Sequence, residues 1–309
     1  SFAHLVFKGG LRTTVEAVSR VWPPQNILPG YALYGATKTE CKGLWFSGTG
    51  NTTITGGSVF SNSNADSVSC QSGVQDGSGA ITVGPPPENI QVVGGFDLGG
   101  SGSVSPLPVV EGAPQDNLRP IPTPDCSALP DYGKEIINAG SPVTLNPGRY
   151  ESISVKAGAS VTMNPGMYCI YGNNGFTGNG GSLSGSGVMI YMQDGGFDLG
   201  GNSLIALAAE ANSGVLVDPS DNDWKGMLVY VDPSNSNPVK LTGNTGTTYT
   251  GTVFAASADC TINGTGDNIG LLSTQIICNT VKITGTAQVN IDYSQSQAYS
   301  LPPAIDLAR

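Results

Sequence analysis

The most constraining feature of this chain is its self-similarity. The segment at 94–100, which reads Gly-Gly-Phe-Asp-Leu-Gly-Gly, recurs unchanged at 195–201. The segment at 143–148, Val-Thr-Leu-Asn-Pro-Gly, returns 18 residues later with Met163 in place of Leu145. Repeats on this scale are typical of solenoids, in which each repeat buries its apolar side only against its neighbours. The repeats therefore predict one elongated stack of coils, with function on a long surface and not in a single pocket.

Short apolar runs, separated by glycine, asparagine and serine, indicate strands throughout residues 31–293. Asn-Gly and Asp-Gly pairs, which favour two-residue hairpin turns, are few. We therefore predict an all-β fold, a single-stranded, right-handed parallel β-helix (β-solenoid). About a dozen rungs of ~20 residues would make a rod on the order of 60 Å long.

The chain divides by composition into three parts. Residues 1–30 form an arm with strand-like alternation, residues 31–293 form the solenoid, and residues 294–309 form a tail. Residues 105–135 are rich in proline and predict a surface insertion through which the stack continues. The polar residues 62–80 predict a loop, and residues 204–211 fit either a short helix or a strand.

Charge and cysteine content limit the compartment and the partners. The 309 residues include 13 Lys and Arg against 23 Asp and Glu, a net charge of −10, which disfavours nucleic acid as a partner. The six cysteines contain no Cys-x-x-Cys pair, and they favour an oxidising compartment with up to three disulfides. The disulfide candidates are Cys41, Cys70, Cys126, Cys169, Cys260 and Cys278. Cys260 and Cys278 are 18 residues apart, so they could bridge adjacent rungs, whereas the other pairings stay open.

Several segments resemble the extracytoplasmic part of TadG-like proteins, a group linked to tight-adherence pili. The resemblance rests on residues 31–34 (Tyr-Ala-Leu-Tyr), 41–46, 52–63, the two Asn-Pro-Gly segments, and the ending at 291–307. It implies a protein of the bacterial envelope or surface, and it carries over no catalytic residue. The chain begins at Ser1 without a signal peptide or a long apolar run, so we expect the targeting segment to be absent from it.

The arm is the candidate for contacts between subunits. A solenoid leaves its end rungs unpaired, and a strand-like arm could supply a strand to a neighbour or cap its own first rung. The alternating residues that would make this contact are Leu11, Thr13, Val15, Ala17 and Val21. We therefore expect the partner to be a second copy of the chain, in an extracellular filament built by end-to-end association.

The alternatives are a monomeric adhesin, a carbohydrate-binding solenoid and a polysaccharide-active enzyme. A carbohydrate site would need an exposed aromatic row, for which the candidates are Tyr150, Tyr168, Tyr171 and Tyr191; core packing explains these residues better. An enzyme would need clustered carboxylates or a base, and acidic and basic residues are sparse in the solenoid. We therefore expect no catalytic residues.

Two sets of aspartates are candidate sites. Asp97 and Asp198 occupy equivalent places in the twin segments, where capping of a turn is a simpler role than catalysis. Asp218, Asp221 and Asp223 form the densest acidic cluster and are a weak candidate for calcium. A solvated acidic turn explains the cluster better, and we expect no cofactor.

Overall fold

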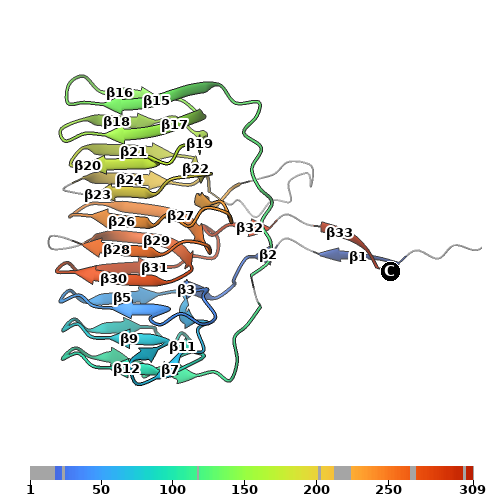
Figure 1. Cartoon of the computed structure of the whole chain (residues 1–309), viewed down its shortest axis with the longest axis vertical. Helices are drawn as coiled ribbons and strands as arrows, with labels where there is room; N and C mark the ends of the chain where they lie inside the picture. Colours follow the sequence, from blue (N-terminus) through green and yellow to red (C-terminus); the bar gives the residue numbers. More distant parts are fainter. Residues whose placement is uncertain are drawn as a thin grey trace, which may run out of the picture.

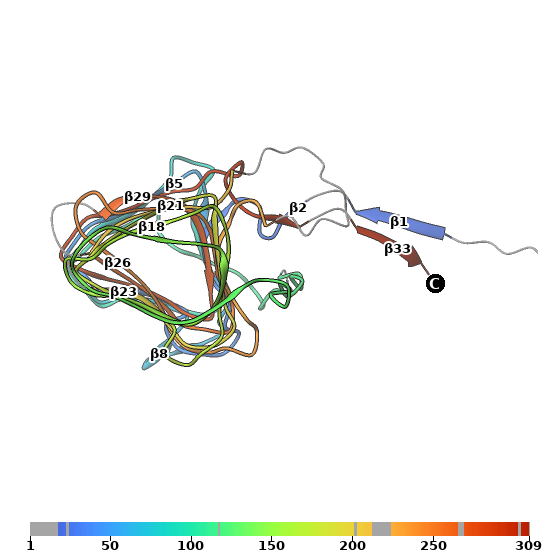
Figure 2. The ribbon, with the colours of Figure 1, turned by 90° about the horizontal axis from the view of Figure 1, so that it is seen from above.

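The computed structural model describes residues 18–22, 25–116, 118–200, 203–211, 224–264, 269–301 and 304–308. In these ranges the chain forms strands and no helix. One sheet contains 27 strands, and its pairings are parallel. The predicted parallel β-helix is therefore confirmed. Figure 1 shows the stacked rungs, and Figure 2 shows their roughly triangular outline.

The rungs align into three faces, whose strands follow one another from the upper to the lower end of Figure 1. The first face contains β15 (Asp131–Ile137), β17 (Gly148–Val155), β20 (Phe176–Asn179), β23 (Phe197–Gly200), β26 (Val239–Gly243), β28 (Cys260–Gly264), β30 (Val281–Gly285), β4 (Leu44–Phe46), β9 (Gly73–Gln75) and β12 (Phe96–Leu98). The second face contains β16 (Val143–Leu145), β18 (Ser160–Met163), β21 (Ser182–Ser186), β24 (Leu204–Ala208), the starts of β27 (Thr248–Ala255) and β29 (Ile269–Cys278), β31 (Val289–Asp292), β5 (Thr52–Thr55), β10 (Ile81–Val83) and β13 (Val104–Ser105). The third face contains the starts of β15 and β17, β19 (Gly166–Ile170), β22 (Val188–Met192), β25 (Met227–Val231), the ends of β27 and β29, β3 (Tyr31–Gly35), β6 (Ser58–Ser61), β11 (Ile90–Val92) and β14 (Val109–Val110).

The rungs do not stack in sequence order. Residues 31–110 form a lower stack and residues 131–292 an upper stack, and the final rung of the chain sits directly on its first. Residues 111–130, the strap, run along the stack from its lower to its upper end (Figure 1). The proline-rich segment is thus a connection along the whole rod. The rungs on its two sides belong to one stack, but they lie at opposite ends of it, because the first and last rungs of the chain pair with each other.

The joint between the two stacks, the seam, is continuous sheet on all three faces. Ile276 pairs with Leu33, Val281 with Leu44, and Val289 with Thr52. Side chains reinforce it: the Gln275 amide donates hydrogen bonds to the carbonyls of Leu28 and Tyr31 at 2.6 and 2.8 Å. None of the three disulfides crosses the seam.

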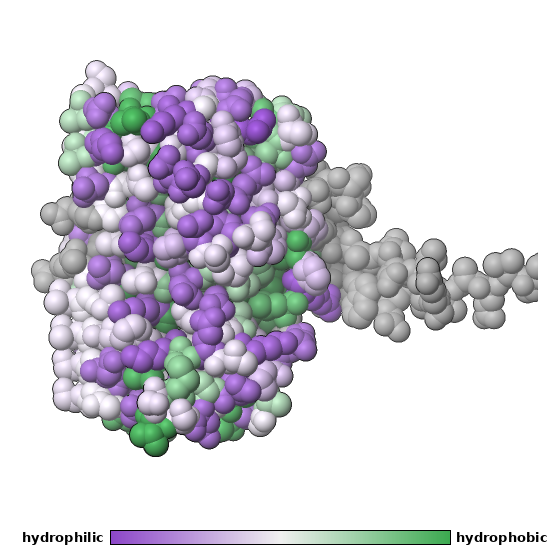
Figure 3. All heavy atoms as spheres, viewed as in Figure 1, coloured by the Kyte–Doolittle hydropathy of each residue, from purple (hydrophilic) through white to green (hydrophobic). Residues whose placement is uncertain are grey.

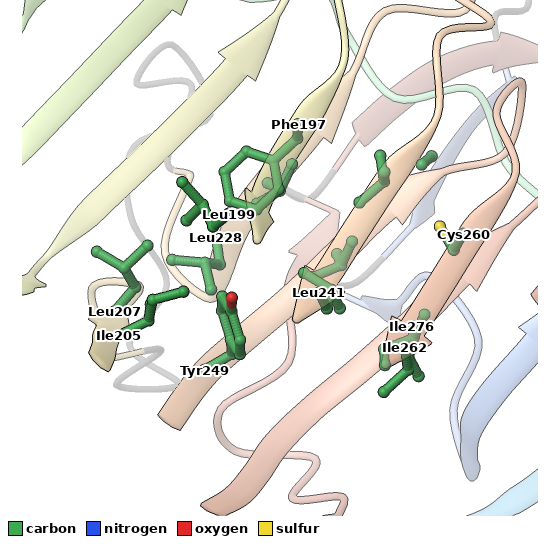
Figure 4. Close-up of a cluster of buried hydrophobic side chains, with 14 of the residues drawn as sticks. Phe197, Leu199, Ile205, Leu207, Leu228, Leu241, Tyr249, Cys260, Ile262 and Ile276 are labelled. Atoms are coloured by element: carbon green, nitrogen blue, oxygen red, sulfur yellow. The ribbon is translucent and has the colours of Figure 1, made fainter. Parts of the chain in front are cut away.

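The interior of the prism is apolar from rung to rung. Inward side chains of β23 to β28, such as Phe197, Leu241 and Ile262, point into a common core (Figure 4). The short 18-residue repeat stacks in register, with Val143 on Val161 and Leu145 on Met163. The segment 204–211, ambiguous in sequence, begins with strand β24.

Glycine shapes the corner between the first and second faces of the lower stack. Gly48, Gly77 and Gly100 lie above one another there, and the N–H of Ser78 donates to the Gly48 carbonyl at 3.1 Å. A Cβ on Gly77 would lie 2.1 Å from the Gly48 oxygen, and one on Gly100 would lie 2.0 Å from the Gly77 oxygen. Only glycine permits this close stacking of backbone on backbone.

Two short antiparallel ribbons pair the two ends of the described chain with each other. β1 (Val18–Trp22) pairs antiparallel with β33 (Ala304–Ala308), and β2 (Gln25–Asn26) pairs antiparallel with β32 (Ser300–Leu301). Figure 2 shows the first ribbon projecting away from the prism. The first rung has neighbours on both sides, because β3 pairs with β29 and β6, so the arm does not cap it.

The predicted loop at 62–80 is only partly a loop. It contains a small hairpin of β7 (Asp66–Ser67) and β8 (Cys70–Gln71), followed by β9 of the first face. The loop prediction is wrong for these residues, since β7 and β8 pair with each other and β9 pairs with β4 and β12 of the neighbouring rungs.

Candidate functional site

The outer side of the third face is a second hydrophobic core. Every residue of β22 and β25 is buried, because the strap, Trp224 and the segment 298–301 cover the strands from outside. Tyr230 stacks on Tyr191 and on Trp224, with ring centroids 5.5 and 5.7 Å apart. Parallel strands buried on both sides read as continuous apolar runs, which is how Val188–Met192 and Met227–Val231 read.

The candidate tyrosines for a carbohydrate-binding row are mostly core residues. Tyr150 and Tyr168 lie inside the prism, and Tyr191 lies beneath the outer cover of the third face. The Tyr168 hydroxyl donates to the carbonyls of Leu145 and Asn164 at 2.9 and 2.8 Å, which ties it to the Asn-Pro-Gly corners. Tyr171 is half-buried and donates to Asp131 at 3.2 Å. These four tyrosines therefore do not form an exposed aromatic row.

Burial also shifts the pKa values of buried tyrosines on both sides of the third face. It raises the pKa of Tyr150 and of Tyr230 to about 12 in each case, because the charged phenolate would lose its hydration. Burial and a hydrogen bond to Asp232 raise the pKa of Tyr191. Burial acts to raise the pKa of Asp232, but hydrogen bonds from Ser234 and Tyr191 outweigh it and leave that pKa lowered. These shifts follow from packing and point to no reaction.

A shallow groove runs between the strap and the third face. It has a volume of about 340 Å³ and is lined by residues including Arg119, Pro120, Tyr230 and Phe254. The strap is fastened on both sides of it, by Cys126–Cys169 to the upper stack and by a hydrogen bond from Asn62 to the Gln115 carbonyl in the lower stack. The groove is mainly apolar and contains no cluster of catalytic side chains among its lining residues.

The first face carries an outward ladder of polar and charged side chains. The two aspartates of the twin segments stand in one register column, because Asp198, Lys240, Thr261, Lys282, Trp45, Val74 and Asp97 succeed one another on adjacent strands. Six rung steps separate them, roughly 29 Å at the usual strand spacing. Glycosidase carboxylates lie within about 10 Å of each other. Asp198 binds Lys240 at 2.7 Å, so it forms an ion pair with the next rung.

Trp45 lies within a cluster of charged side chains on this ladder. Lys42 and Lys282 place their ammonium groups 3.8 and 3.6 Å from its ring centroid. Its indole N–H donates to Asp76 at 2.9 Å, and Lys42 lies 3.7 Å from the same carboxylate. The cluster joins the strands on both sides of the seam, since Lys282 and Trp45 are register partners.

The second face carries small neutral side chains on its outside. Thr144, Thr162 and Ser184 follow one another in register on the upper stack, and Thr53 and Thr82 do so on the lower stack. Ala206, Asn290 and the exposed Leu204 also lie on this surface, so hydroxyl groups are present on several rungs and not on each one.

The candidate metal site lies outside the described residues, as Asp218, Asp221 and Asp223 all fall in residues 212–223. Within the described ranges, no group of three or more His, Cys, Asp or Glu side chains could hold a metal ion. Leu11, Thr13, Val15 and Ala17 of the arm also lie outside those ranges, and Val21 pairs with Ile305 in the ribbon.

All six cysteines form disulfides, each with a different task. Cys260–Cys278 joins neighbouring rungs inside the prism, the pairing suggested by their spacing. Cys41–Cys70 fastens the β7–β8 hairpin, and Cys126–Cys169 fastens the strap. Three disulfides are typical of proteins that fold in an oxidising or extracellular environment. In the ranges that the structure describes, no helix is long and apolar enough to span a membrane.

The two ends of the stack are the positions where the strand ladder stops. Among the residues that the structure describes, β12, β13 and β14 at the lower end each pair with one neighbour only, as do β15 and β16 at the upper end. Large apolar side chains are exposed at the lower end: Leu98 at 50%, Leu107 at 68%, Val109 at 48% and Val110 at 65%. Figure 3 shows hydrophobic residues gathered at the lowest part of the stack.

This lower end was not predicted from the sequence. Three of its exposed residues fall in the segment expected to be a proline-rich insertion, whereas they belong to the lowermost rung of the stack, which contains β12, β13 and β14. The twin segments at 94–100 and 195–201 contain the first-face strands β12 and β23, so the expectation that Asp97 and Asp198 cap turns is wrong. Their likeness was still a usable signal that residues around 96 belong to a rung.

Comparisons with known proteins leave the family open. No protein-family model, curated protein or solved structure matches the chain.

Proposed function

We propose that this protein is an extracellular structural component whose β-helical rods associate end to end. The observation that carries the proposal is the open lower end, where three strands have an edge that no described strand pairs with, and where inward-facing side chains are exposed. Unpaired strand edges and exposed apolar side chains both favour association with another strand edge.

The seam supports the same idea from within the molecule. There, two stacks that are not consecutive in sequence join through all three faces, by strand pairing and by buried side chains. Rungs of this sequence can therefore complete each other without being covalent neighbours. End-to-end association would repeat between molecules what the seam already does within one.

Location and strand donation belong to the proposal as well. The three disulfides fit an extracellular protein, and the resemblance to TadG-like proteins suggests the bacterial envelope. Residues 18–22 already pair with residues 304–308 of the same chain, so donation of a strand to a neighbour remains a prediction for the preceding part of the arm.

The test is the mass of the purified chain in solution, measured by light scattering over a range of concentrations, with negative-stain microscopy of the particles. We expect assemblies larger than 31.5 kDa that Leu98→Lys or Val110→Lys reduces to monomers. Val68→Lys is the matched control, because Val68 is 99% exposed at the tip of the β7–β8 hairpin. A monomer at every concentration would overturn the proposal.

A further inference from the structure

The two ends of the stack differ in what they would present to another copy. At the lower end, Leu98 and Val110 continue inward-facing columns, since they pair with Gln75 and Val92 of the rung above. Phe96 and Val104 pack against the core, partly exposed. The inward positions of this lowermost rung are thus apolar.

The upper end places a carboxylate and an aromatic ring in the equivalent position. Glu135 pairs in register with Ile153, which is fully buried, so Glu135 continues an inward-facing column. Tyr132 stacks on Tyr150 at 5.1 Å and covers the end of the tyrosine column. The register of β15 is also irregular between Asp131 and Lys134. Inward charges and bulges are devices by which edge strands avoid pairing.

This difference disfavours a head-to-tail contact. Continuing the sheet from the lower end of one copy to the upper end of another would place Phe96 over Glu135, because both occupy the same column of the first face. Burying that carboxylate against an aromatic side chain without a hydrogen-bond partner is costly. A contact between two lower ends buries apolar side chains against apolar side chains.

We propose that two copies of the chain join through their lower ends, related by a two-fold axis. The inference rests on the proposed end-to-end association and names its polarity. In this arrangement β14 of one copy runs antiparallel to β14 of the other, and β12 meets β13 of the second copy. Pro106 and Pro108 have no N–H to satisfy, so the contact beside them depends on Leu107 and Val109. An interface of this kind is closed, so it yields a dimeric rod with an upper end at each tip.

Cysteine cross-linking distinguishes the two polarities. Val109→Cys at the lower end and Asp131→Cys at the upper end are both exposed positions, and they stand in the same column of the third face, so a head-to-tail contact would bring them together. Under mild oxidation we expect Val109→Cys alone to give a covalent dimer in non-reducing electrophoresis, and Asp131→Cys alone to give none. A cross-link that forms only when the two variants are mixed would show head-to-tail contact, which overturns the inference and leaves the proposed function standing. No cross-link in either case, with a monomeric mass, would overturn both.

A second variant tests the part assigned to the upper end. Replacing Glu135 by leucine removes the inward carboxylate and leaves the lower end untouched. We expect the mass to rise beyond twice 31.5 kDa as upper ends become able to associate, while Lys134→Leu, outward and adjacent, leaves it unchanged. An unchanged dimer in both variants would show that Glu135 does not protect the upper end.

Discussion

The third and first faces of the prism are built from the same kind of strand, yet they end up in different environments. Strands of the first face alternate buried and half-exposed residues, as in β23 and β30. Strands of the third face are buried throughout, as in β22 and β25. The difference comes from the strap, Trp224 and the segment 298–301, which cover the third face from outside.

The comparison shows how a thin solenoid can gain a second core. The first face relies on the interior and on outward polar contacts, such as the pair between Lys240 and Asp198. The third face adds an outer layer of stacked aromatic rings that includes Tyr191, Tyr230 and Trp224. The strap runs along both stacks and so connects them. None of the three disulfides crosses the seam.

The largest expected effect comes from removing a ring in the outer layer of the third face. Tyr230→Ala should lower the free energy of unfolding by about 3–5 kcal/mol, because the side chain is fully buried and its loss leaves a cavity. Lys240→Ala, at an outward position of the first face, should cost less than about 1 kcal/mol, since the pair with Asp198 is exposed. Denaturant unfolding of both variants measures the difference. Equal costs would mean that the outside of the third face is not a core.

The next effect tests whether the strap needs its disulfide. The double variant Cys126→Ser, Cys169→Ser should lose about 2–4 kcal/mol of stability, because the unfolded chain regains freedom. Hydrogen exchange should also become faster in the strap and in β25. The matched control is Cys41→Ser, Cys70→Ser, which frees the hairpin and leaves the strap fastened. Unchanged exchange in the strap would show that packing alone holds it in place.

The smallest expected effect concerns the pKa values of one tyrosine outside the third face and one inside the prism, measured by alkaline titration. The pKa of Tyr230, outside the third face, and that of Tyr150, inside the prism, are each raised to about 12 from a usual value near 10. Their contribution to stability is therefore complete below pH 10 and is lost as the pH rises through about 12. Absorbance of tyrosinate, followed together with circular dichroism, measures both events. In the Cys126→Ser, Cys169→Ser variant the pKa of Tyr230 should fall and that of Tyr150 should stay, whereas a parallel fall would indicate general loosening.

Much of the fold could be predicted because the rungs of a solenoid appear as repeats in the sequence. The 18-residue step from Val143 to Val161 indicated a repeat, and in the structure these two residues are register partners on adjacent rungs. The pattern at 188–192 and 227–231 showed strands but did not show why they are apolar throughout, since their cover comes largely from the distant strap and the segment 298–301. The candidate site was less predictable: Val109 and Val110 look like part of a proline-rich loop until β11 is placed above them.

The sequence by itself determined the parallel β-helix, the corners and the rung pairing of its repeats, because those depend on residues one rung apart. Only the tertiary structure decided the order of the rungs, the seam and which rungs became the ends. Stacking is governed by strand edges, and any rung of suitable shape can cover another. The chain therefore places its last rung on its first, and it leaves as its ends two rungs, β12–β14 and β15–β16, that the strap connects in sequence.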